Sequence, residues 1–110
     1  MANQPISVAT ANAMIQENIT YMSGLGVNMS NQTQSVSFDG IILQQWLANV
    51  MPFADELRIC IGVYPKGDPN AGRVTTILWP YKNGQPATEP SAAGGADVMI
   101  DPYNEGQGEP

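Results

Sequence analysis

The sequence predicts an α+β domain in which two N-terminal helices pack on a small antiparallel sheet built around one β-hairpin. Three observations predict this class. Apolar residues recur at helical spacing in two stretches that precede Pro52. From Leu57 onward they alternate with other residues instead, which is the pattern of a strand. A loop rich in turn-forming residues, 66–72, then leads into a second strand-like run, so the two strands are expected to form a hairpin.

The length and composition fit one domain. The chain has 110 residues, of which 43% are hydrophobic. The segment after Lys82 holds four of the nine prolines and five of the eleven glycines, which leaves no room for a long regular element. We therefore expect a single α+β domain over residues 1–102 and a flexible C-terminal tail over residues 103–110.

The first helix is expected over residues 7–23. Ser7 is available as the N-cap, and Gly24 and Gly26 supply the residues that accept the left-handed backbone closing a helix. Apolar side chains form one stripe at spacings of three and four: Val8, Ala11, Ile15, Ile19 and Met22. The stripe predicts an amphipathic helix with one side on the sheet, followed by a polar connector over residues 28–37.

The second helix is expected over residues 39–51 and is ended by Pro52. Two residues compete for the N-cap. Ser37 would allow an apolar contact across the first turn, whereas Asp39 would place a carboxylate at the positive end of the helix dipole. We favour Asp39. The inward stripe comprises Ile42, Leu43, Trp46, Leu47, Val50 and Met51.

The hairpin strands are expected over residues 57–64 and 73–81. If they pair about the middle of the loop, Ile59 lies opposite Trp79 and Cys60 lies opposite Leu78. The side that carries Ile59 then meets the helices, and a slip of one residue would exchange the faces of one strand. Asn83-Gly84 predicts a tight turn with both residues at positive φ. A third strand near Gln85 would be held to the sheet edge by prolines, and residues 96–100 are the later strand candidate.

Charge and residue types exclude several functions. Four basic and ten acidic residues give a net charge of −6, which argues against nucleic acid or an anionic membrane surface as partner. No apolar run is long enough to cross a membrane. The chain lacks His and has a single cysteine, Cys60, so we expect no metal, no cofactor and no catalytic residues. The adjacent Asp55 and Glu56 are expected to diverge into solvent. Without a recognisable export signal, the expected compartment is the cytoplasm.

Two binding hypotheses remain, and both concern the hairpin. Residues 57–82 hold all four basic residues and one acid, a local charge of +3, while residues 83–110 carry a charge of −5. This distribution permits a small-molecule or anion site between hairpin and helices. Its expected ligand-binding residues are Arg58, Arg73, Tyr64 and Trp79.

The favoured hypothesis is a small, non-catalytic protein-interaction or self-associating module. The second hairpin face is more apolar than a face left in water, so the tail, a protein partner or a second copy in a homodimer is expected to cover it. The expected interface residues are Trp79, Tyr81, Cys60 and Leu78.

Three sequence stretches also carry a resemblance. They are Leu57-Arg58-Ile59, Gly62-Val63-Tyr64 and the run from Arg73 to Tyr81, preceded by Leu43 and Trp46-Leu47. Over about residues 6–84 the chain resembles a group of small bacterial proteins without an assigned function. The resemblance implies a bacterial cytoplasmic protein with the same order of helices and strands, and it brings no activity or catalytic residues.

Overall fold

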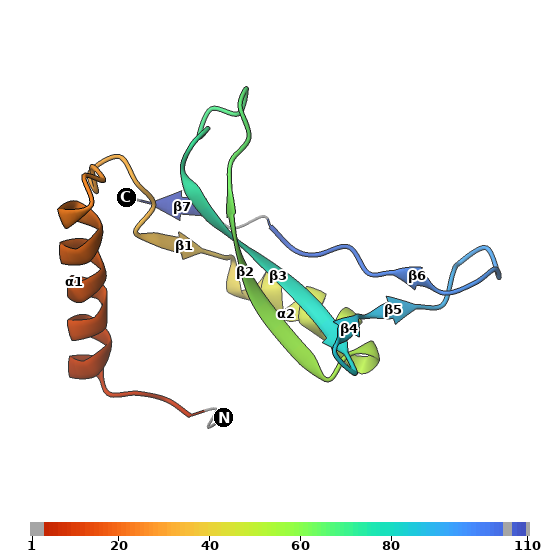
Figure 1. Ribbon diagram of the computed structural model, residues 1–110. Coiled ribbons are helices and arrows are strands. Elements are labelled where there is room, and N and C mark those ends of the chain that lie inside the picture. The colour runs from red at the N-terminus through yellow and green to blue at the C-terminus, as the bar shows by residue number, and fades with distance from the viewer. Residues whose placement is uncertain (1–3, 105–106, 110) are drawn as a thin grey trace.

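The computed structural model describes residues 4–104 and 107–109, and its first element is a helix, α1, over Val8–Gly24 (Figure 1). The hydroxyl of Ser7 accepts a hydrogen bond from the backbone N–H of Thr10 at 3.0 Å, which is the expected N-cap. At the other end Gly26 has φ 89°, and the N–H of Val27 donates to the carbonyl of Met22. This bond closes a Schellman motif, so both predicted helix signals are confirmed.

The predicted packing of this helix on the sheet is wrong. Figure 1 shows α1 standing apart from the hairpin, and no residue of α1 is buried. Apolar side chains such as Val8, Met14 and Ile15 are exposed. Helical periodicity shows that a helix has an apolar side, but it carries no information about which surface covers that side.

The second helix, α2, spans Gly40–Val50 and passes into a short 3₁₀ turn, η1, over Met51–Phe53. The Asp39 carboxylate accepts hydrogen bonds from the N–H groups of Ile41 and Ile42, both at 3.0 Å. Asp39 is therefore the N-cap, as we favoured. The end of the α-helix just before Pro52 is also confirmed.

The main sheet has the order β2-β3-β4, with β2 over Glu56–Val63, β3 over Val74–Lys82 and β4 over Gln85–Pro86. All pairings are antiparallel. Asn83 and Gly84 have φ of 52° and 76°, so the predicted tight turn is confirmed. The edge position of β4 is also as predicted.

The predicted hairpin register is wrong by one residue. Ile59 lies opposite Leu78, and Cys60 lies opposite Ile77. The loop explains the shift, because Tyr64 pairs with Arg73: its N–H donates to the Arg73 carbonyl and its carbonyl accepts from Gly72. The slip places Trp79 on the face that carries Arg58.

Two further pairs of short strands complete the described chain. β1, over Ser35–Ser37, pairs with β7 over Gln107–Glu109, and β5, over Thr88–Glu89, pairs with β6 over Val98–Met99. The connector predicted as polar loop thus includes a strand, and β6 falls inside the predicted late candidate. The predicted flexible tail falls partly on residues 105–106 and 110, which lie outside the described residues.

The core lies where α2 meets the chain that follows the hairpin. Val50, Ala87 and Ile100 form its buried cluster, with Trp46 and Met51 packed against it. Next to this cluster the ring of Tyr103 contacts those of Phe38 and Trp46, with centroids 5.6 and 5.0 Å apart. The backbone of Tyr103 exchanges hydrogen bonds with that of Leu78, so this aromatic group lies against β3.

The molecule is extended for its size. Its Cα radius of gyration is 16.9 Å, whereas a compact domain of this length has one of about 13 Å. Its accessible surface is 7957 Å², against about 5,900 Å² for a compact monomer of its mass. About 2,000 Å² of additional surface is therefore left in contact with solvent.

Candidate functional site

The hairpin brings the four predicted ligand-binding residues to one face, but in two separate pairs. Arg58 lies opposite Trp79 on the adjacent strand. Tyr64 lies beside Arg73 where the loop begins. Tyr64 lies six positions after Arg58, a distance of about 20 Å along an extended strand. A single small ligand therefore cannot bridge all four side chains.

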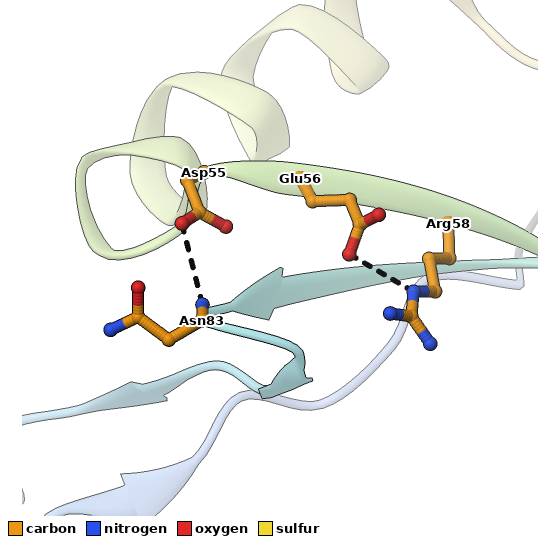
Figure 2. A network of polar contacts seen from close by, with 4 residues as sticks. All are labelled: Asp55, Glu56, Arg58 and Asn83. Atoms are coloured by element: carbon orange, nitrogen blue, oxygen red, sulfur yellow. Dashed lines mark hydrogen bonds and ion pairs between the residues drawn. The ribbon is translucent and has the colours of Figure 1, made fainter. Parts of the chain in front are cut away.

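Arg58 is held by two neighbours on this face. Its Nε donates to Glu56 Oε1 at 3.0 Å, and both side chains are about half exposed (Figure 2). Its guanidinium carbon lies 3.9 Å from the ring centroid of Tyr81, a cation–π contact. Trp79 meets Tyr81 edge-on, with centroids 6.2 Å apart. Arg58, Tyr81 and Trp79 thus form one cationic and aromatic surface. The charge of Arg58 on this surface is already paired with Glu56.

Asp55 and Glu56 diverge, as predicted. Figure 2 shows the Asp55 carboxylate turned toward Asn83, whose N–H donates to it at 3.3 Å, while Glu56 turns toward Arg58. Asp55 thereby supports the tight turn at residues 83–84. The two carboxylates do not converge on a common point, so they form no acid–base pair.

The second pair lies near Asn104. The Thr75 hydroxyl is 3.2 Å from both the Tyr64 phenol and Asn104 Oδ1. Arg73 donates through Nη1 to Asn70 Oδ1 at 3.3 Å. Its Nε and Nη2 are buried without a hydrogen-bond partner among the described residues.

A cavity of about 360 Å³ lies on the opposite face of the hairpin. It is formed between residues 33–38 and the strands, with Phe38, Ile59 and Leu78 in its wall. None of the four predicted ligand-binding residues lines it. The cavity therefore does not correspond to the predicted site.

The predicted interface residues are also divided between faces. Cys60, Trp79 and Tyr81 share the face of Arg58 and are half-buried. Leu78 lies on the other face and is 6% exposed, because the one-residue shift in register reverses it. The prediction that Leu78 belongs to an exposed interface is therefore wrong.

The most exposed apolar feature of the hairpin is one that sequence reasoning assigned to the core. Leu57, Ile59, Ile61 and Val63, here called the β2 row, are 36, 65, 70 and 61% exposed. Alternation along the strand identified this row correctly as one apolar face. Tyr103 pairs with Leu78 on β3, so its aromatic group lies beside β3, while the β2 row on the neighbouring strand is exposed.

No group of three or more His, Cys, Asp or Glu side chains in residues 4–104 and 107–109 is arranged to hold a metal ion. Across the same residues, no helix has the length and apolar character needed to cross a membrane. Comparison of the chain with protein-family models, curated proteins and solved structures finds no match.

Proposed function

We propose that this chain is a non-catalytic, self-associating interaction module. The β2 row carries the proposal. A strand of eight residues stands at the edge of its sheet with four apolar side chains exposed in succession. Native proteins normally protect such edges with charge, proline or a covering element. The two charged residues of β2, Glu56 and Arg58, pair with each other near its start, and the apolar row that continues beyond them is typical of a surface that pairs with another chain.

The surplus surface of the molecule supports the same proposal. About 2,000 Å² beyond the compact expectation exceeds the roughly 800 Å² that each partner buries in a standard stable interface. The exposed apolar residues of α1, including Met14 and Ile15, add to this surface. Burial in an assembly would offset the small size of the core, whose main cluster among the described residues has three buried members.

A small-molecule or anion site is the alternative, and it has less support. Its four residues form two pairs about 20 Å apart along the strand. Arg58 is already paired with Glu56, and the cavity is lined by other residues.

The test is the mass of the protein in solution, measured by native mass spectrometry and light scattering over a range of concentrations. We expect a dimer or larger species. Ile61→Glu should weaken association at least about 100-fold, because an unpaired carboxylate buried in an interface costs several kcal/mol. A monomer at the highest soluble concentration would contradict the proposal.

Ile41→Glu is the matched control. Ile41 is 69% exposed, close to the 70% of Ile61, but it lies on α2 away from the β2 row. This variant should keep the mass of the unaltered protein. Equal loss of association in both variants would show that general surface hydrophobicity, and not the β2 row, drives self-association.

A further inference from the structure

We propose that β2 pairs antiparallel with β2 of a second copy, around a two-fold axis that passes through Cys60. This inference rests on the proposed self-association and specifies its geometry. The assembly would be a continuous six-stranded sheet, with the two β2 strands at its centre and the two β4 strands at its edges.

The hydrogen-bonding pattern of the hairpin shows which groups face the open edge. In an antiparallel ladder, both backbone groups of a residue point to the same side of the strand. Leu78 exchanges both of its hydrogen bonds with Tyr103, so its groups point away from β2, and its pair with Ile59 is a non-hydrogen-bonded one. Ile59 therefore directs its N–H and carbonyl toward the open edge.

The same alternation extends along the strand. Tyr64 directs its N–H and carbonyl inward, to Arg73 and Gly72, so the even-numbered residues of β2 face β3 and the odd-numbered ones face outward. The outward set is the β2 row itself: Leu57, Ile59, Ile61 and Val63. Among the described residues, the outer edge of β2 thus offers backbone groups that pair with no other strand, and the same residues carry the exposed apolar side chains of the β2 row on one face of the sheet.

The pattern of β2 selects one register. Antiparallel partners share a face, so the two-fold axis must pass through a residue and not between two residues. An axis at Cys60 places Ile59 opposite Ile61 of the partner subunit and Leu57 opposite the partner's Val63. An axis at Ile59 would instead place Val63 opposite the partner's Asp55, a carboxylate against an apolar side chain.

An axis at Ile61 fails for a related reason. It would place Leu57 opposite the partner's Pro65, beyond the end of β2, where no ladder continues. In the register centred on Cys60 every member of the row meets another member. On the reverse face Arg58 meets the partner's Gly62, so no like charges oppose each other.

This self-complementarity identifies a second copy as the occupant. A different protein would need its own apolar edge of matching pattern, whereas β2 matches itself without a charge conflict.

The register makes a chemical prediction about the single cysteine. Cys60 would face the partner's Cys60 as a non-hydrogen-bonded pair, in which the Cα atoms lie about 4.5 Å apart. Disulfides form across Cα separations of roughly 4.4–6.8 Å. The two thiols would therefore be close enough to join when an oxidant removes their two hydrogen atoms.

The experiment treats the reduced, unaltered protein with diamide and follows the covalent dimer by non-reducing electrophoresis and intact mass. We expect rapid, nearly complete conversion at a rate independent of protein concentration once the dimer is formed. The unaltered, purified protein is used directly in this experiment.

The control is the double variant Cys60→Ser with Arg58→Cys. It moves the thiol two residues along the same strand and the same face. In the proposed register the two new thiols lie four residues out of alignment, about 13 Å apart, and should crosslink at least about tenfold more slowly. Circular dichroism would verify that the hairpin is retained.

The outcomes separate this inference from the proposed function. A non-covalent dimer by mass in which Cys60 does not crosslink, or in which both thiols crosslink equally, would overturn the β2 register and leave self-association standing. A monomer by mass would overturn both. Selective crosslinking of Cys60 in a dimer supports both.

Discussion

Gly84 illustrates how closely single residues determine the hairpin. Its φ of 76° follows that of Asn83 at 52°, and together they form the tight turn between β3 and β4. Glycine has no Cβ to clash in this left-handed region, whereas other residues pay about 1–2 kcal/mol there. This turn could be predicted from the sequence, because the backbone conformation of a tight turn depends on the residues within it.

We expect Gly84→Ala to lower the free energy of unfolding by about 1 kcal/mol and the melting temperature by about 5 °C. Gly95→Ala is the control. Gly95 has no positive φ, and a Cβ built on it meets nothing within 4 Å. Thermal unfolding of both variants at one protein concentration makes the comparison. An equal effect would show that the strained backbone at residue 84 is not the cause.

A second residue-scale prediction concerns Asp39. Its carboxylate accepts from two N–H groups at the start of α2. Asp39→Ala should cost about 1 kcal/mol of stability, whereas Asp39→Asn retains a capping oxygen and should cost much less. Urea unfolding distinguishes the two. If both variants lost the same stability, the charge of Asp39 and not its cap would be responsible.

The elements differ in how much stability their apolar residues provide. Ile100 is 4% exposed and belongs to the cluster with Val50, while Ile41 is 69% exposed on α2. We expect Ile100→Ala to cost about 2–5 kcal/mol and Ile41→Ala less than about 0.5 kcal/mol. Chemical denaturation at one concentration measures both. A small effect at Ile100 would indicate that the cluster is not the stabilising core.

The elements also mark where sequence reasoning ends. Helix starts, helix stops and the alternation of β2 follow from contacts within a few residues, and they were predicted correctly. The register of the hairpin failed by one residue, because it depends on how the loop closes at Tyr64 and Arg73. The exposed state of the β2 row could not be predicted, since alternation defines an apolar face without naming what covers it.

The predicted ligand site of four residues is divided into two pairs in the structure. Arg58 and Trp79 were expected to contribute to one ligand site with Tyr64 and Arg73, and each pair does form. The spacing along the strand separates them, which a list of chemically suitable residues does not reveal. The apolar edge, in contrast, was present in the sequence as Leu57, Ile59, Ile61 and Val63, and it was assigned to the core.

At the scale of the whole molecule, self-association should make thermal stability depend on concentration. A dimer that unfolds to separate chains gains stability by mass action as concentration rises. We expect the melting temperature of the unaltered protein to increase over a hundredfold range of concentration, as mass action requires, and that of Ile61→Glu to increase less over the same range. Differential scanning calorimetry tests this. A constant value for both proteins would argue against linkage between folding and assembly.

The isolation of α1 has a consequence for its dynamics. A single helix of 17 residues with no buried side chain is close to the limit of stability in water, so we expect it to unwind and reform more often than β3. Its amide hydrogens should therefore exchange with deuterium much faster than those of the hairpin. A partner that binds to α1 would slow the exchange of its amide hydrogens. The exchange rate of α1 therefore measures whether a partner has bound to this helix.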